Sequence, residues 1–338
     1  MGVSFGFKAA HEQFSPRQLL EHCVIADKEG FNSVWASDHF HPWFHSGAQS
    51  GFAWVWMAAV AERTTNLSLG TGVTAPILRY HPALVAQAFA TLGHLYPDRI
   101  RLGLGSGEAL NEMPLGYSWP SLKERMERLE EALEVIRKLW SGGFVVHKGK
   151  YYTLRNAKLY TRPEKPVPIY VAGFGPKMAR LAGRYADGFY SFLSQPLEVY
   201  RDTVFPALKK GADEAGRVLS QIGSSIEMLF SLDEDLDKAT ESIRRWAGSL
   251  LPVFFKYGVW DPREIEEHAE KVGLEAIKKN WVITDNPDDI VRKAEQCYDA
   301  GFDEVVFMSS SPNQFKVIET LGRQVIPYLK EKYNAKRV

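Results

Sequence analysis

Side chains that can move protons follow directly after an apolar segment near the start of the chain. Residues 32–36 (Asn-Ser-Val-Trp-Ala) have the composition of a short buried strand, and Pro42 prevents the strand from continuing. Asp38, His39 and Trp43 therefore lie in the turn after this strand. Enzymes of the α/β class carry their reactive side chains at the carboxyl ends of strands. The sequence predicts an enzyme whose active site includes this turn.

The chemistry available to this turn is proton transfer to or from an oxygen atom. A histidine with an ordinary pKa can take a proton from an alcohol or return one to a ketone. The indole N–H of Trp43 only donates, so it can hold a substrate oxygen that gains negative charge. A single histidine at a strand end is also a common structural residue, and for His39 this alternative stays open.

A second turn, Gly103–Glu112, repeats the arrangement of a strand followed by glycines, a carboxylate and an amide. Glu108 follows Gly-Ser-Gly, so little side-chain bulk separates it from a ligand. A desolvated carboxyl group has a raised pKa and can donate a proton. The alternative is a residue near a helix N-terminus, where acids are favoured, and we assign Glu112 to that role. Glu12, just after the first strand, is expected to face the same end of the fold.

Glycine-rich strand ends indicate a flat ligand with an anionic tail. Gly72 follows one strand, which is typical of a backbone that closely approaches a planar group. Gly173–Pro176 ends another strand and opens a helix, whose free N–H groups can bind a phosphate. Each turn alone is weak evidence, but the pair predicts a long ligand with a planar ring and a phosphate-bearing tail.

Three histidines near Asp38, namely His39, His41 and His45, form the strongest metal-binding pattern in the sequence. His41 and His45 have helical spacing, but Pro42 disrupts a helix there, and no Cys-rich or His-rich partner segment occurs elsewhere. We therefore expect no metal site. The alternative for His41 and His45 is packing in a solvated loop or an interface.

The composition is that of an ordinary globular protein of 338 residues, in which 41 basic and 41 acidic side chains balance. Without a basic tract, nucleic-acid binding is not expected. Two cysteines, Cys23 and Cys297, are too few for a disulfide framework. The longest apolar stretch is far shorter than the roughly 20 residues of a membrane span, and the start lacks a signal-peptide core. We expect a cytoplasmic protein without membrane contact.

Eight short apolar runs alternate with segments of helical periodicity, which predicts a single (β/α)8 TIM-barrel domain over residues 1–338. A doubly wound sheet is the competing fold, but no Gly-x-Gly-x-x-Gly turn follows the first strand. Two insertions interrupt the alternation, a hairpin within residues 144–165 and a mostly helical segment at 234–285. The expected strands are Val3–Lys8, Ser33–Asp38, Leu67–Gly72, Ile100–Gly105, Val167–Gly173, Gly188–Leu193, Ser225–Leu232 and Glu304–Ser309.

Three of these segments resemble the luciferase-like barrel superfamily, and within it the dehydrogenases that depend on coenzyme F420. The segments are Ser37–Trp43, Tyr80–Leu92 and Gly107–Glu112, and the similarity extends over nearly the whole chain. The resemblance implies a luciferase-like barrel, F420 as cofactor, a small-molecule substrate and a homodimer. Two alternatives stay open: a flavin-mononucleotide (FMN) monooxygenase of the same superfamily, and a barrel that only binds a flavin or a partner.

The resemblance also implies roles for individual residues. His39 matches the proposed base for the substrate hydroxyl, Trp43 a residue that steadies the substrate oxygen, and Glu108 the acid that protonates the deazaflavin. Glu12 matches a further active-site acid. The Gly72–Val73 peptide bond should be cis. The implied cofactor contacts are Asp38, Gly72, Val73, Glu108, Asn111, Ala172, Gly173, Phe174 and Gly175.

The substrate distinguishes two branches of the resembling dehydrogenases. The glucose-6-phosphate branch binds its phosphate with a Thr, two Lys and an Arg, where this chain has Phe192, Gln195, Lys256 and Asn280. Only the lysine remains, which leaves a phosphate dianion poorly paired. Residues 246–252 and 254–257 instead resemble the secondary-alcohol branch. We therefore expect hydride transfer from a small secondary alcohol such as isopropanol to F420, with a sugar-phosphate dehydrogenase as the alternative. The expected substrate pocket is Phe192, Trp246, Phe255 and Lys256.

Overall fold

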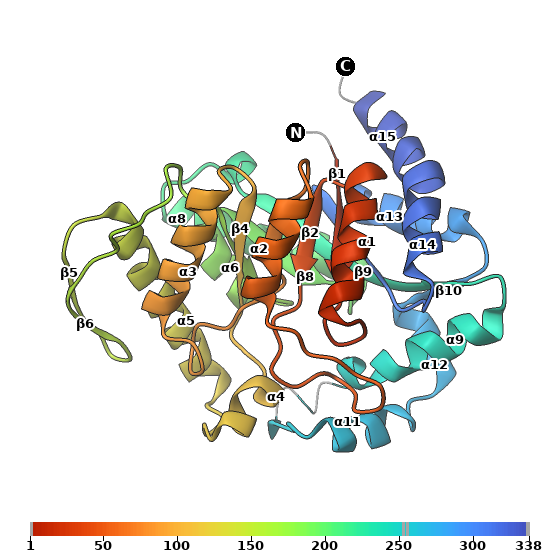
Figure 1. Ribbon diagram of the computed structural model, residues 1–338, viewed down its shortest axis with the longest axis horizontal. Coiled ribbons are helices and arrows are strands. Elements are labelled where there is room, and N and C mark those ends of the chain that lie inside the picture. The colour runs from red at the N-terminus through yellow and green to blue at the C-terminus, as the bar shows by residue number, and fades with distance from the viewer. Residues whose placement is uncertain (1–2, 252–253, 255–256, 336–338) are drawn as a thin grey trace.

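The computed structural model describes residues 3–251, 254 and 257–335 (Figure 1). Within this described part, eight parallel strands close into a barrel in the order β1, β2, β3, β4, β7, β8, β9 and β11. The pairing of β8 with β9 closes the barrel and excludes the open doubly wound sheet. The strands are β1 (Ser4–Ala9), β2 (Ser33–Ala36), β3 (Ser68–Thr71), β4 (Ile100–Leu104), β5 (Val145–Lys148), β6 (Thr153–Ala157), β7 (Ile169–Ala172), β8 (Gly188–Phe192), β9 (Gly223–Leu232), β10 (Val282–Thr284) and β11 (Glu304–Ser309).

The predicted TIM barrel is confirmed, and each of the eight expected runs contains a barrel strand. Several strands end before the predicted residue, because Asp38, Gly72, Gly105 and Gly173 already belong to the turns that follow. The short strand β10 was not predicted. It pairs with the C-terminal end of β9, beyond the part of β9 that β8 covers.

Helices surround the strands, and their apolar faces pack on the outside of the barrel (Figure 1). Local signals fix several helix starts. Ser15 and Gln18 form a capping box for the helix that begins at Pro16, and Asn286 caps the helix that begins at Pro287. The helices are α1 (Pro16–Lys28), α2 (Ala53–Arg63), α3 (Pro82–Leu95), α4 (Ala109–Glu112), α5 (Leu122–Ser141), α6 (Pro176–Tyr185), α7 (Leu197–Val199), α8 (Phe205–Glu214), α9 (Leu236–Arg244), α11 (Pro262–Ala269), α12 (Leu274–Asn280), α13 (Pro287–Asp299), α14 (Gln314–Thr320) and α15 (Ile326–Ala335).

Two segments depart from the alternation of strand and helix. Strands β5 and β6 form an antiparallel hairpin that projects from the barrel. Helices α9, α11 and α12 lie at the lower right and bottom of the view in Figure 1. Their buried residues Ile243, Ile265 and Ile277 belong to the same apolar cluster as Leu110 of α4, the helix that follows β4. This second segment therefore lies at the end of the barrel that carries the carboxyl termini of the strands, where α/β barrels have their active sites.

The barrel interior holds two ion pairs, one buried and one half-buried at its arginine, although side chains such as Val, Ile and Leu usually fill this space. Near the amino ends of the strands, Glu304 accepts from Ser33 (2.5 Å) and Ser225 (2.6 Å) and pairs with Arg101 (3.3 Å). Closer to the carboxyl ends, Lys8 pairs with Glu227 at 2.6 Å.

In the part of the chain that the structure describes, no helix is both long and apolar enough to cross a membrane.

Candidate active site

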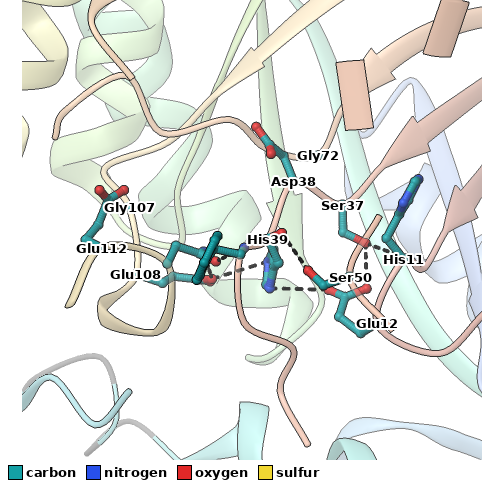
Figure 2. A network of polar contacts seen from close by, with 12 residues as sticks. His11, Glu12, Ser37, Asp38, His39, Ser50, Gly72, Gly107, Glu108 and Glu112 are labelled. Atoms are coloured by element: carbon teal, nitrogen blue, oxygen red, sulfur yellow. Dashed lines mark hydrogen bonds and ion pairs between the residues drawn. The ribbon is translucent and has the colours of Figure 1, made fainter. Parts of the chain in front are cut away.

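His39 lies between two carboxylates at the carboxyl end of the barrel (Figure 2). Its Nδ1 is 3.5 Å from Oε1 of Glu12, and its Nε2 is 3.4 Å from Oε2 of Glu108. The three side chains come from the turns after β1, β2 and β4. The imidazole is largely buried, with 9% of its side chain exposed. The sequence-predicted acids and base are therefore brought together in one cluster.

Backbone and side-chain hydrogen bonds fix both sides of this cluster. Ser37 Oγ donates to Glu12 Oε2 at 2.6 Å, and the N–H of His11 donates to Ser37 Oγ at 3.1 Å. The carbonyl of His39 accepts from Ser50 Oγ at 2.7 Å. The Glu12 carboxylate and the backbone of His39 are therefore each held by a hydrogen bond, and Ser37 is a supporting residue that the sequence did not single out.

Asn111 connects the His39 turn to Glu108. Its Oδ1 accepts from the N–H of Phe40 at 2.7 Å, and its Nδ2 donates to Glu108 Oε2 at 3.3 Å. Asn111 is itself buried. The predicted cofactor contact thus has two protein partners that hold the histidine turn and the acid at a set distance.

Glu108 occupies the N-cap position of α4, but its side chain makes no capping hydrogen bond. The carboxylate faces His39 instead. Burial raises the pKa of Glu108, the charge on Glu12 raises it further, and the positive charge of His39 opposes the shift. Glu108 is therefore able to hold a proton at a pH where an exposed glutamate has lost it.

Glu112 lies in the single turn of α4, as expected, but it points away from His39 (Figure 2). Its carboxylate is fully buried and accepts from the N–H of Arg79 at 2.8 Å. Burial is the largest influence and raises the pKa of Glu112 to about 7.

This buried acid predicts a pH-dependent stability. Between the ordinary pKa of 4.5 and about 7, the folded chain keeps a proton on Glu112 that the unfolded chain has lost. The free energy of unfolding should therefore fall as pH rises through this window, by up to about 3 kcal/mol. Glu112→Gln should become more stable relative to the unchanged protein over the same window. Urea unfolding at several pH values measures the difference, with Glu21→Gln on the exposed surface of α1 as control. A constant difference between Glu112→Gln and the unchanged protein would contradict this prediction.

Asp38, a predicted cofactor contact, is turned toward the protein. Its carboxylate is buried and accepts from Thr74 Oγ1 at 2.5 Å and from the Tyr80 hydroxyl at 3.2 Å. Arg79 donates to this carboxylate at 3.2 Å and also to the backbone carbonyl of Asp38. Thr74, Arg79 and Tyr80 follow β3, and no local sequence signal links them to a residue that follows β2. Together they hold the residue that precedes His39.

Aromatic residues form one wall beside His39. The ring centroids of Trp43 and His39 are 6.3 Å apart, and Trp43 is buried. Trp246, also buried, donates its indole N–H to Gln13 Oε1 at 3.1 Å. Phe192, at the end of β8, packs against the apolar cluster that contains both tryptophans. The predicted pocket residues Phe255 and Lys256 lie outside the described residues.

The predicted ring and phosphate positions lie in two turns rich in glycine, after β3 and β7. The peptide bond between Gly72 and Val73 is cis, which confirms the expectation. Gly175 is the N-cap of α6 with no side-chain cap, and the space where a Cβ would lie is open. The first N–H groups of a helix have no intrahelical acceptor, so this terminus can bind an anion. Ala172–Gly175 therefore fit a phosphate-bearing tail.

His41 and His45 lie apart from the His39 cluster. They line a cavity of about 610 Å³ between the turn after β2 and the start of α11, together with Trp260 and Arg263. The His41 ring stacks on Trp260, with ring centroids 6.4 Å apart. Among the described residues, no group of three or more His, Cys, Asp or Glu side chains is arranged to hold a metal ion.

Comparison with known proteins agrees with this architecture. The model of the luciferase-like monooxygenase family matches residues 2–304. The chain belongs to this family. Two relatives are 43% identical to this chain: the F420-dependent glucose-6-phosphate dehydrogenase of Nakamurella multipartita, over 97% of both chains, and F420-dependent glucose-6-phosphate dehydrogenase 2 of Rhodococcus jostii, over 97% of this chain and 98% of the relative.

Two solved structures resemble this luciferase-like chain along nearly its whole length. An F420-dependent secondary alcohol dehydrogenase in complex with an F420-acetone adduct is 40% identical, with a TM-score of 0.94, over 97% of this chain and 99% of the other. The coenzyme F420-dependent tetrahydromethanopterin reductase of Methanopyrus kandleri is 27% identical, with a TM-score of 0.78, over 97% of this chain and 100% of the other. The family and the barrel are therefore established, while these relatives act on different substrates.

Proposed function

We propose that this chain is an F420-dependent oxidoreductase that converts a small secondary alcohol, such as isopropanol, to a ketone. The observation that carries the proposal is the cluster in which Glu12 and Glu108 flank His39. Relatives that match almost the whole chain are named as F420-dependent dehydrogenases. One solved structure among them is a complex with an F420-acetone adduct. The overall change is balanced: the alcohol loses a hydride and a proton, and the cofactor gains both.

The residues present fit this cofactor. Gly72 and Val73 would hold the ring, Ala172–Gly175 would hold the phosphate-bearing tail at the start of α6, and Asn111 would contribute a polar contact. When bound, the deazaflavin of F420 supplies the hydride acceptor. FMN is the alternative cofactor, but the relatives named above are F420-dependent enzymes.

Side chains of the protein take up the proton of the alcohol and supply a proton to the cofactor. Nε2 of His39 takes the hydroxyl proton of the alcohol, while Glu12 beside Nδ1 stabilises the imidazolium that results. The carboxyl of Glu108 holds a proton because burial raises its pKa, and it supplies that proton to the reduced cofactor. The indole of Trp43 orients the substrate oxygen. Hydrogen bonds from Asn111 to Glu108 and from Ser37 to Glu12 hold the two carboxylates in position.

An apolar wall favours an alcohol over a sugar phosphate. Phe192 packs against the cluster of Trp43 and Trp246, which provides a surface for alkyl groups. Gln195, where the sugar-phosphate branch has a cation, donates its amide to the Phe174 carbonyl at 2.7 Å. Asn280 donates its amide to the Ala276 carbonyl at 2.9 Å. These two positions therefore supply no positive charge to a phosphate.

Glucose-6-phosphate oxidation is the second candidate, because relatives with 43% identity carry that name. The test supplies purified protein and F420 with either isopropanol or glucose 6-phosphate and follows the loss of oxidised deazaflavin absorbance. We expect kcat/KM for isopropanol to exceed that for the sugar phosphate by at least roughly a hundredfold, since an unpaired dianion is strongly disfavoured in an apolar pocket.

A gain-of-function variant sharpens this test. Phe192→Thr, Gln195→Lys and Asn280→Arg together restore the polar set of the sugar-phosphate branch, so this triple variant should turn over glucose 6-phosphate and lose isopropanol activity. Turnover of glucose 6-phosphate and not isopropanol by the unchanged protein would reverse the choice of substrate. Turnover of neither substrate, with yellow FMN bound after purification, would favour a monooxygenase.

A further inference from the structure

The ion pair of Lys8 and Glu227 lies inside the barrel. Its lysine contacts Gly72, one of the predicted cofactor contacts. Lys8 Nζ donates to Glu227 Oε2 at 2.6 Å and to the carbonyl oxygen of Gly72 at 2.7 Å. The two side chains are 5% and 8% exposed. The ammonium therefore connects the interior of β1 and β9 to the peptide that joins Gly72 to Val73.

Tyr190 completes this arrangement from a third strand. Its hydroxyl donates to Glu227 Oε2 at 2.6 Å, the same oxygen that accepts from Lys8. A Cβ on Gly72 would lie 3.0 Å from the Tyr190 hydroxyl oxygen and 3.1 Å from Lys8 Nζ. Gly72 thus lies directly against both polar groups, and residues from β1, β8 and β9 restrain one turn after β3.

Stability alone does not account for a buried ion pair at this position. Removing two charges from water costs about as much as their attraction returns, so an apolar replacement of both partners is often neutral or stabilising. A pair that also binds a backbone carbonyl restrains the orientation of that peptide group. The Gly72 carbonyl belongs to the peptide assigned above to the ring of the cofactor.

We propose that Lys8 is a positioning residue, whose ammonium, held by Glu227, fixes the Gly72–Val73 peptide in the orientation that the cofactor ring requires. The part of this inference that concerns the cofactor rests on the proposed function. The part that concerns the peptide rests on the hydrogen bonds alone. Lys8 touches no reacting atom in this assignment and acts through Gly72.

The second ion pair, whose glutamate is buried and whose arginine is 24% exposed, provides a control within the same barrel. Arg101 and Glu304 are 3.3 Å apart, and Glu304 also accepts from Trp35 Nε1 at 3.1 Å. The partners of Glu304 lie at or near the amino ends of the strands, away from the turns that form the site. Removing this pair tests the effect of losing buried charges without touching Gly72.

The experiment compares Lys8→Met/Glu227→Gln with Arg101→Met/Glu304→Gln. Amide hydrogen exchange of residues 72–76 is measured without cofactor, and the dissociation constant of F420 is measured by fluorescence titration. Loss of a hydrogen bond to a charged donor should raise both the exchange rate and the dissociation constant roughly tenfold in the Lys8 variant. The Arg101 variant should keep both within about threefold, although its melting temperature changes.

Two further variants separate positioning from stability. Glu227→Gln alone retains acceptors for Lys8 and Tyr190, so F420 affinity should stay within about threefold of the original. Lys8→Leu/Glu227→Leu is a fully apolar version of the double variant, and it gives the same readings if the methionine version does not fold. Its affinity should stay low even where its melting temperature equals that of the unchanged protein.

Unchanged exchange at residues 72–76 together with unchanged F420 affinity in either Lys8 double variant overturns the inference. Equal losses in the Lys8 and Arg101 variants also overturn it, because the effect would then be general. If the unchanged protein does not bind F420 at all, the proposed function fails, while the exchange measurement still tests whether Lys8 holds the peptide.

Discussion

Replacing His39 with alanine is expected to lower kcat for isopropanol by about 10²–10⁴-fold, which is the usual contribution of a general base. The imidazole is the group of this cluster that can take the hydroxyl proton, and both of its nitrogens face carboxylates. Loss of the ring leaves Glu12 and Glu108 without the positive charge that forms between them. F420 affinity should change by less than about threefold, because the proposed cofactor contacts on Gly72 and α6 are untouched. Stopped-flow absorbance at saturating alcohol and fluorescence titration of F420 provide the two measurements.

His41→Ala is the matched control for this prediction. His41 belongs to the same turn, but it stacks on Trp260 and lines the neighbouring cavity. Its removal should leave kcat within about threefold of the original value. A His39→Ala variant that retains the original rate, or a His41→Ala variant that loses as much as His39→Ala, would remove His39 as the proposed base.

The barrel could be predicted from the sequence because its strands are short apolar runs that end in glycine or polar residues. Residues 304–309 were predicted with the observed bounds, and the others shifted by a few residues at their ends. Strand β10 was missed because its three residues pair only with the uncovered end of β9, which is a consequence of tertiary structure. A local sequence pattern does not indicate which strand will pair with such a short segment.

The candidate site was predictable to the extent that its side chains follow strands. His39, Glu12 and Glu108 each come just after a strand, and parallel strands bring such turns together. The supporting groups were missed, because Arg79 reaches Asp38 only through the folded chain. Lys8 carried one usable signal, a charge within an apolar strand. In a strand that is buried on both sides, such a charge requires a partner, and Glu227 in β9 carries the matching signal.

Glu108→Gln is the second variant with a large expected effect, because glutamine keeps the shape of the side chain but has no proton to give. We expect kcat for isopropanol to fall by about 10²-fold or more. In the unchanged protein, burial raises the pKa of Glu108, so the protonated form persists above the ordinary range of a glutamate. As pH rises through that raised pKa, the acid loses its proton and the rate should decline. The variant should lack this decline.

The pH profile distinguishes proton donation by Glu108 from a role in holding His39. Asn111 donates to the same Oε2 atom, and a glutamine can keep this contact, so the His39 turn should stay in place in the variant. Glu112→Gln, which removes a neighbouring buried acid that points away from His39, should retain the high-pH decline of the unchanged protein. Profiles of kcat against pH for the three proteins provide the measurement. If Glu108→Gln shows the same decline as the unchanged protein, another group controls that step, and Glu108 then acts only through its contacts with His39 and Asn111.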